Sequence, residues 1–206
     1  MLSYRSFHDL DGGQTSMSFS DSLQQGQLGE SIIAQWLRSR GWHVLPAYEK
    51  EIDNGKGPRL FLAQGNRMSQ LIVPDILGIR NGDFKWFEVK HKTRFTWYGK
   101  GKYFVTGIDK RHFDDYCQVA SVTDLPVWVL FLHVNSDTWK PDVEKWNAPA
   151  QCPTGLFGAE ITKMREQMSH FSDRHGTTGM YYWQPFVNLY LLATLNDVRQ
   201  VTRLAA

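Results

Sequence analysis

Residues 71–92 read LIVPDILGIRNGDFKWFEVKHK and contain two apolar runs on either side of Asn81-Gly82-Asp83. An Asn-Gly pair between strand-forming residues is a strong signal for a tight β-hairpin turn. Side chains alternate between the two faces of a strand, so Glu88 and Lys90 share a face and lie about 6.6 Å apart along it. A hairpin also brings the start of its first strand beside the end of its second, which places Asp75 near both. We therefore predict that two carboxylates and one amine converge at one end of a small sheet.

This set of groups suits the hydrolysis of a phosphodiester. Mg²⁺ prefers oxygen ligands and commonly binds one or two carboxylates together with waters and a substrate phosphate. A bound divalent ion polarises the phosphoryl oxygen and lowers the pKa of its water, and a lysine supplies a point charge for the phosphate. An ordinary Glu–Lys pair on an exposed strand would produce the same local pattern, so the hairpin by itself leaves both interpretations open.

The order Pro74-Asp75, twelve intervening residues, then Glu88-Val89-Lys90 resembles the motif of the PD-(D/E)XK nuclease superfamily. The expected succession of helix, hairpin, helix and strand across residues 22–135 is also similar to the core of that family. The resemblance implies that Asp75 and Glu88 bind Mg²⁺, or Mn²⁺ as a substitute, with the Val89 carbonyl as a candidate third ligand. It implies that Lys90 positions and activates the attacking water and that DNA is the substrate. Junction resolvases, phage-type exonucleases and repair endonucleases all agree with this pattern.

A helix is predicted over residues 22–40, because apolar residues recur there at helical spacing before Gly41. Glu30 falls on the same side of this helix as Ile33 and Leu37. A carboxylate on a buried face needs a polar or charged partner. In many PD-(D/E)XK nucleases a helix before the sheet presents a glutamate to the site, and the resemblance makes Glu30 its counterpart. A glutamate at the margin of the apolar stripe with an ordinary salt bridge remains the alternative.

The segment 90–111 is basic and rich in aromatic residues, although the net charge of the whole chain is only +2. Basic and aromatic side chains together suit a phosphate backbone and unstacked bases. A solvated loop supported by its aromatic residues is the alternative. The predicted nucleic-acid contacts are Lys92, Lys100, Lys102, Lys110 and Arg111.

The remaining pattern predicts an α/β fold with a mixed central sheet flanked by helices. A helix is expected over 109–121, followed over 125–134 by a continuous apolar run typical of a strand buried on both faces. Beyond this strand we expect a loop over 135–157, a helix over 158–169, a strand or an extended cover over 180–183 and a final helix over 187–198. The predicted organisation is an irregular N-terminal arm (1–20), a restriction-endonuclease-like core (21–136) and a helical C-terminal extension packed on that core (137–206).

Composition narrows the function classes further. The chain has 206 residues, of which 42% are hydrophobic and 14% aromatic, enough for one well-packed domain. Two cysteines cannot form a four-thiolate zinc or iron–sulfur site. His170 and His175 lie five residues apart, which does not fit a helical zinc pair, so both are expected at the surface. The N-terminus has no signal-peptide pattern and the longest apolar run, 126–132, is too short to span a bilayer. A reduced, cytoplasmic protein is expected.

We therefore predict a Mg²⁺-dependent deoxyribonuclease with DNA as its partner and no membrane association. A second copy of the chain is a candidate partner, and so is another protein bound at the N-terminal arm or the aromatic surface. Two alternatives stay open: a module of this fold that binds nucleic acid without cutting it, and a protein-interaction adaptor.

Overall fold

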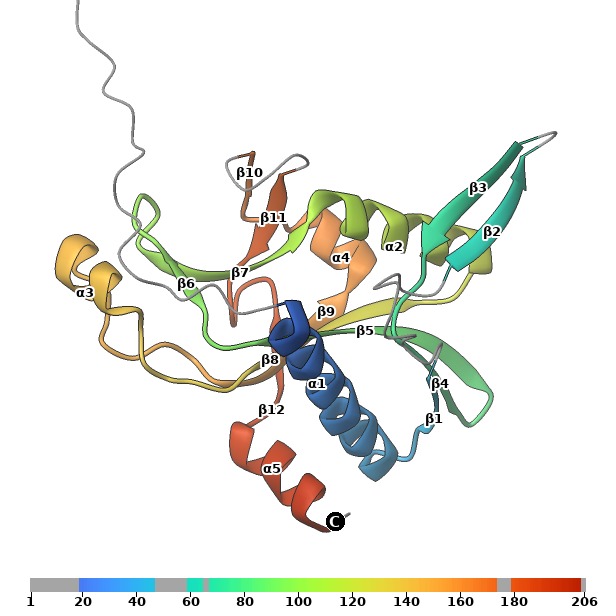
Figure 1. Ribbon diagram of the computed structural model, residues 1–206, viewed down its shortest axis with the longest axis horizontal. Helices are drawn as coiled ribbons and strands as arrows, with labels where there is room; N and C mark the ends of the chain where they lie inside the picture. The colour runs from blue at the N-terminus through green and yellow to red at the C-terminus, as the bar shows by residue number, and fades with distance from the viewer. Residues whose placement is uncertain (1–18, 47–58, 65–66, 174–178, 205–206) are drawn as a thin grey trace, which may run out of the picture.

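The computed structural model describes residues 19–46, 59–64, 67–173 and 179–204. The predicted N-terminal arm lies outside the described residues except for its last two positions, which begin the first helix. The polar segment 47–58 and His175 also lie outside them. Figure 1 shows a central sheet crossed by helices, with a smaller sheet beside it.

Among the described residues, six strands form the central sheet in the order β1-β4-β5-β8-β9-β12. Their bounds are β1 (His43–Pro46), β4 (Ile76–Arg80), β5 (Asp83–Lys92), β8 (Val127–His133), β9 (Gly155–Glu160) and β12 (Tyr190–Ala193). β5 and β8 run parallel, and the other neighbouring strands are antiparallel. The predicted mixed sheet is confirmed.

The predicted hairpin is formed by β4 and β5, whose register pairs Ile76 with Phe87 and Arg80 with Asp83. Asn81 and Gly82 both have positive φ angles, 52° and 86°, as a turn between tightly paired strands requires. The first apolar run is divided, however. Its beginning belongs to β3 (Arg67–Ile72), which pairs with β2 (Arg59–Gln64) in a separate two-stranded sheet that projects from the body in Figure 1. Pro74 lies between β3 and β4 and has no N–H to donate to a strand ladder.

Helices cover both faces of the central sheet. On one face, α1 (Phe19–Ser39) and α5 (Leu195–Leu204) pack their apolar residues, among them Ile33, Leu37 and Val198, onto Val89 and Leu130. On the other face, α2 (Lys110–Thr123) and α4 (Ile161–Glu166) pack onto the same sheet from the opposite side. β8 is therefore buried on both faces, as its continuous apolar sequence predicts.

The basic and aromatic segment forms part of a second sheet instead of a loop. This sheet has the order β10-β11-β7-β6, with β6 (Thr96–Tyr98), β7 (Tyr103–Asp109), β10 (His170–Ser172) and β11 (Met180–Trp183). Of the two possibilities for residues 180–183, a strand or an extended cover, the structure has the strand, β11. One face of the second sheet joins the core through Ile108 and Trp183.

The C-terminal third differs from its prediction in three places. The loop over 135–157 contains α3 (Lys140–Trp146) and the start of β9. The helix expected from 158 begins only at Ile161, because the preceding residues form β9. A Cβ added to Gly158 would lie 2.8 Å from the Val129 carbonyl oxygen, so this glycine permits close contact with β8.

The prediction of a final helix over 187–198 is also wrong. Residues 190–193 form β12, and α5 starts only at Leu195. Thr194 caps α5: its hydroxyl accepts a hydrogen bond from the Asp197 N–H, and its own N–H donates to Asp197 Oδ2 at 3.0 Å. The expected boundary near residue 136 thus falls between β8 and β9, which are neighbours in one sheet. The C-terminal third contributes two strands to the core and is not a purely helical extension.

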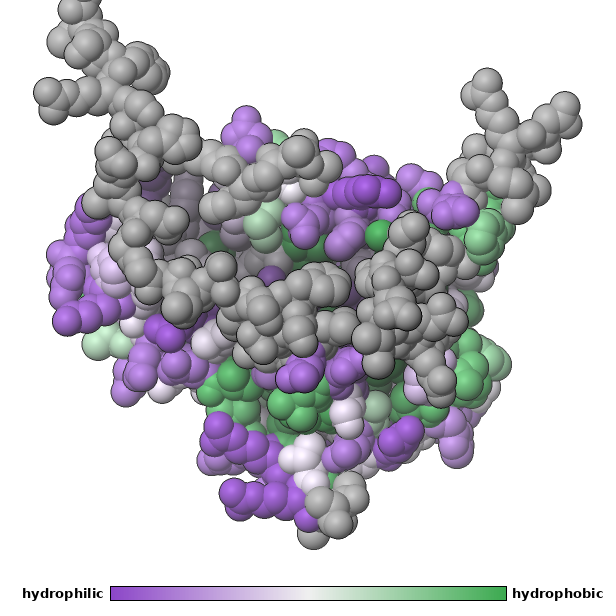
Figure 2. Space-filling model, viewed as in Figure 1, coloured by the Kyte–Doolittle hydropathy of each residue, from purple (hydrophilic) through white to green (hydrophobic). Residues whose placement is uncertain are grey.

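The surface is polar where helices extend from the core. Figure 2 shows hydrophilic residues gathered over α3 and over α5, where Lys140, Glu144 and Arg199 are exposed. No helix in the described ranges is both long enough and apolar enough to cross a membrane.

His133, at the end of β8, is fully buried and stacks on Phe95 with ring centroids 3.6 Å apart. Burial lowers its pKa to about 3. An unfolded histidine titrates near pH 6.5, so below this pH the unfolded state binds a proton that the folded state does not. The free energy of unfolding should therefore fall as the pH drops from 6.5 toward 3. The loss at pH 4.5 should be about 2.7 kcal/mol, two pH units at ~1.36 kcal/mol each.

Urea unfolding of the wild type and of His133→Phe at pH 7 and pH 4.5 measures this contribution. Phenylalanine keeps the stacked ring and cannot take up a proton, and the carboxylates that titrate are the same in both proteins. Between pH 7 and pH 4.5 the free energy of unfolding of the His133→Phe protein should fall by about 2.7 kcal/mol less than that of the wild type. An equal loss in both proteins would show that His133 contributes nothing to acid sensitivity.

Candidate active site

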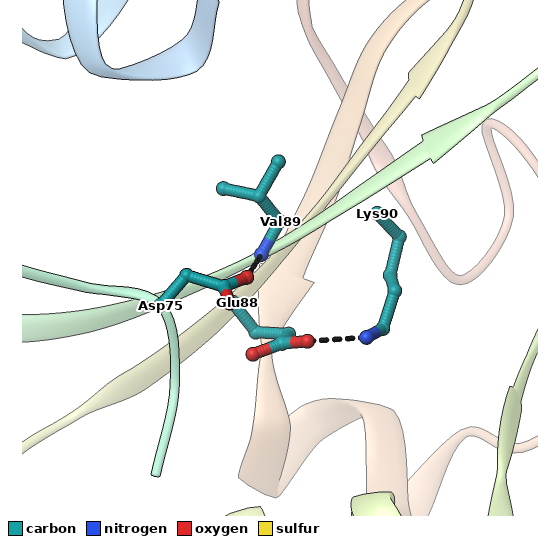
Figure 3. Close-up of polar contacts among 4 residues, drawn as sticks. All are labelled: Asp75, Glu88, Val89 and Lys90. Atoms are coloured by element: carbon teal, nitrogen blue, oxygen red, sulfur yellow. Dashed lines mark hydrogen bonds and ion pairs between the residues drawn. The ribbon is translucent and has the colours of Figure 1, made fainter. Parts of the chain in front are cut away.

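The β4–β5 hairpin brings the predicted carboxylates together. Ile76 pairs with Phe87, so Asp75 and Glu88 are next to each other one position further along the two chains. Asp75 Oδ2 accepts a hydrogen bond of 2.9 Å from the Val89 N–H, as Figure 3 shows. This bond fixes the Asp75 carboxylate against β5 immediately beyond the end of β4.

Glu88 and Lys90 extend from the same side of β5, and Val89 extends from the other side (Figure 3). The Lys90 ammonium forms an ion pair with Glu88 Oε1. The Glu88 side chain is only 2% exposed, and its second oxygen, Oε2, is buried without a hydrogen-bond partner among the described residues. Burial opposes the charge of Lys90, but the Glu88 and Asp75 carboxylates hold the pKa of Lys90 above its ordinary value. Lys90 is therefore a cation at neutral pH.

Glu30 reaches this region because α1 passes very close to β5. A Cβ added to Gly29 would lie 2.5 Å from the Cβ of His91, so only glycine allows this approach. The next residue, Glu30, lines a cavity of about 270 Å³ together with Asp75. Gln27, Ser31 and Arg38 line the same cavity. The structure thus places Glu30 near Asp75 as expected, and its catalytic role stays a prediction.

Two residues of α2 that the sequence analysis did not select lie close to Lys90. The Tyr116 ring centroid is 6.0 Å from Lys90 Nζ, within the range of a cation–π contact. His112, one helical turn earlier, has its pKa lowered first by burial and then by the Lys90 cation. Their spacing of four residues marks one helix face. Only the packing of α2 on the central sheet shows that this face meets Lys90.

The predicted nucleic-acid contacts are spread over three places. Lys92, at the end of β5, is half-buried, and burial followed by the nearby Lys90 cation lowers its pKa. Lys100 and Lys102 are exposed in the turn between β6 and β7, and Arg111 is exposed in the first turn of α2. Lys110 pairs with the Asp114 carboxylate. Contact of these residues with DNA stays a prediction.

The donor atoms at the site fit an ion with oxygen ligands. Within the described ranges, no group of three or more His, Cys, Asp or Glu side chains is arranged to hold a metal. Mg²⁺ does not need such a group, because one or two carboxylates suffice when waters and a phosphate complete its shell. The Asp75 and Glu88 carboxylates supply that pair, and the buried Glu88 Oε2 has the lone pairs to accept a cation. The Val89 carbonyl points to the same side of β5 as the Val89 N–H that meets Asp75.

No protein-family model matches the sequence, and no curated protein matches it. Solved structures that resemble the fold include Hjc, a Holliday junction resolvase from Archaeoglobus fulgidus, an archaeal hyperthermophile. It is 10% identical over 77% of this chain and 88% of its own, with a TM-score of 0.41. Another is D212, a nuclease from a fusellovirus, 14% identical over 88% of this chain and 91% of its own, with a TM-score of 0.34. Both TM-scores lie below 0.5, so the function of this chain has to be inferred from its own side chains.

Proposed function

We propose that the chain is a metal-dependent nuclease that hydrolyses phosphodiester bonds of DNA. The observation that carries the proposal is the convergence of Asp75, Glu88 and a charged Lys90 at one end of the β4–β5 hairpin. A buried carboxylate oxygen without a hydrogen-bond partner is costly unless a ligand satisfies it. This arrangement is therefore better explained by a bound cation than by an ordinary surface ion pair.

Each residue has a part in this chemistry. Asp75, Glu88 and the Val89 carbonyl would hold Mg²⁺, which when bound polarises the phosphoryl oxygen and makes its water more acidic. Lys90 would orient the attacking water and offset the charge that develops on the phosphate. Glu30, which lines the same cavity as Asp75, would accept a hydrogen bond from a water in the outer shell. The apolar side chains beneath the sheet keep the geometry of these groups fixed.

Divalent ions should stabilise the folded protein. An ion that binds the folded state alone raises the free energy of unfolding by RT ln(1 + [L]/Kd), about 2.7 kcal/mol at one hundred times Kd. Mg²⁺, Mn²⁺ and Ca²⁺ should each raise the melting temperature of the wild type, and Asp75→Asn should remove most of that rise. Asp114→Asn is the matched control, because it removes a carboxylate that pairs with Lys110 outside the site. A melting temperature that no divalent ion changes, with or without DNA, would contradict the metal site.

Cleavage is tested on linear, nicked, branched and single-stranded DNA, with an RNA strand for comparison, in Mg²⁺, in Mn²⁺ and in EDTA. We expect products from at least one DNA substrate with either metal and none in EDTA. DNA binding without cleavage of any substrate would instead identify the chain as a non-cleaving binding module.

A further inference from the structure

Three aromatic rings from three different strands stack on one face of the second sheet. The His170 ring lies between Tyr98 and Tyr182, with centroids 4.1 Å and 4.6 Å away and interplanar angles of 19° and 7°. We call Tyr98, His170 and Tyr182 the aromatic column. Tyr103 stands beside it, with its ring centroid 5.3 Å from that of Tyr98. His170, expected to be a surface histidine, is half-buried between the two tyrosines.

Strand alternation puts the column on the face of the second sheet opposite to Ile108. Ile108 of β7 is buried in the core, while Val105 and Gly107 belong to the opposite face. Gly107 pairs with Tyr182, and a Cβ added to it would lie 2.8 Å from the Tyr182 ring. The missing side chain at position 107 therefore lets the tyrosine ring lie flat on the sheet and form one end of the column.

The column is one wall of an open cavity of about 410 Å³, a size within the usual range of small-ligand sites. Lys100 lines the cavity and is exposed, and Ser172 and Asp173 add oxygen acceptors to its rim. The described lining thus combines flat aromatic surface, one cation and hydrogen-bond acceptors. A purely structural role for cross-strand rings would need neither the cavity nor the charged rim.

Asp109 connects the aromatic column electrostatically with the candidate active site. Asp109 is two residues beyond Gly107 on the same face of β7, about 6.6 Å along the strand. Burial raises the pKa of Tyr182, and the Asp109 carboxylate raises it further. The same carboxylate also raises the pKa of Lys90. Its effect is smaller than the effects of burial, Glu88 and Asp75. Asp109 is therefore within electrostatic reach of both the column and the catalytic lysine.

We propose that the aromatic column is a stacking site for a nucleobase of an unpaired strand, so that the preferred DNA carries a single-stranded segment beside the bond that is cut. The proposal rests on the proposed nuclease function and specifies its substrate class. Stacking on an aromatic ring is available to every base, because each base has a π-face. Lys100 would meet the phosphate of the stacked nucleotide, and the Ser172 and Asp173 oxygens would accept hydrogen bonds from base amino groups.

The test is carried out in EDTA, so that binding is measured without turnover. The probe is a duplex with a single-stranded overhang in which one nucleotide is 2-aminopurine, whose fluorescence falls on stacking, and a blunt duplex of the same sequence is the comparison. Tyr98→Leu removes the ring and keeps apolar bulk, whereas Tyr98→Phe keeps the ring. Loss of one stacked base should weaken overhang binding about 5- to 150-fold. We expect Tyr98→Leu to show this loss of affinity and to lose the fluorescence quenching, and we expect Tyr98→Phe to show neither. The affinity of either variant for the blunt duplex should stay within about twofold of the wild type.

An abasic site in place of 2-aminopurine repeats the test on the wild-type protein, so the result does not depend on how well a variant folds. The abasic overhang should bind the wild type as weakly as the intact overhang binds Tyr98→Leu. Equal affinity of the wild type for the intact and abasic overhangs, or no quenching at any overhang position, would overturn the stacking site.

The two proposals fail in different ways. If the wild-type protein quenches 2-aminopurine but cuts no DNA in Mg²⁺, the proposed nuclease function is wrong and the stacking site stands. If the protein cuts DNA but binds intact overhangs, abasic overhangs and blunt duplexes with equal affinity, the nuclease function stands and only the stacking site is wrong.

Discussion

Replacing Glu88 by glutamine should lower the rate of DNA cleavage at least about 100-fold while the protein remains folded, a loss of ~2.7 kcal/mol of barrier lowering. Glutamine has the same shape and keeps one oxygen, but it lacks the negative charge that binds a cation. The expected loss is large because Glu88 is almost fully buried and its Oε2 has no other partner among the described residues. Asp75→Asn should have a similar effect, since Asp75 is the second carboxylate of the site.

Single-turnover cleavage at saturating DNA is the appropriate measurement, with circular dichroism and a melting curve to show that each variant is folded. Asp114→Asn again serves as the control, because it changes the same net charge and should cut at the wild-type rate. Near-normal cleavage by a folded Glu88→Gln protein would mean that the site has been assigned to the wrong residues.

The second large effect is expected for Lys90→Met, which should slow cleavage about 10²- to 10³-fold and change DNA affinity much less. Methionine keeps most of the length and apolar contact of lysine and removes only the charge. Lys90 is three-quarters buried and held in place by Glu88, so its charge acts at one point instead of along the DNA backbone. A charge that acts on the reacting phosphate should contribute mainly in the transition state.

Lys100→Met provides the opposite pattern as a control. Lys100 is exposed in the turn between β6 and β7 and is not part of the group formed by Asp75, Glu88 and Lys90, so it should contribute to binding through a phosphate contact. Its loss should reduce the slope of log affinity against log salt by about 0.9 and leave the rate at saturating DNA unchanged. If Lys90→Met instead reduced affinity and slope while cutting at the normal rate, Lys90 would be a binding residue only.

Local signals account for the parts of the fold that the sequence predicts correctly. The β4–β5 hairpin follows from Asn81-Gly82 between alternating residues, and α1 and α2 follow from the 3.6-residue spacing of their apolar positions. The proximity of Asp75, Glu88 and Lys90 needs only this hairpin. For that reason the proximity of these three residues could be predicted from the sequence, whereas their catalytic roles stay a prediction.

The wrong predictions arise where tertiary contacts override a local pattern. Leu191, Leu192 and Leu195 have helical spacing, yet Leu191 pairs with Phe157 of β9 in the central sheet. The Thr194–Asp197 capping pair marks the true start of α5, and this local signal is present in the sequence. The aromatic column has no such signal. Its three rings are distant in sequence and meet only because β11 pairs with both β7 and β10.

The parallel pairing of β5 with β8 also determines when, during synthesis of the chain, the candidate site can be completed. When β5 leaves the ribosome, β1 and β4 have already been made, but the edge of β5 that pairs with β8 is still open. Glu88 stays hydrated until Val129 pairs beside it, after the whole crossover through β6, β7 and α2 has been made. A nascent or prematurely terminated chain that ends before β8 therefore contains Asp75, Glu88 and Lys90 but lacks the strand that pairs beside Glu88. If the proposed nuclease function holds, this topology would delay DNA cleavage until β8 has been made.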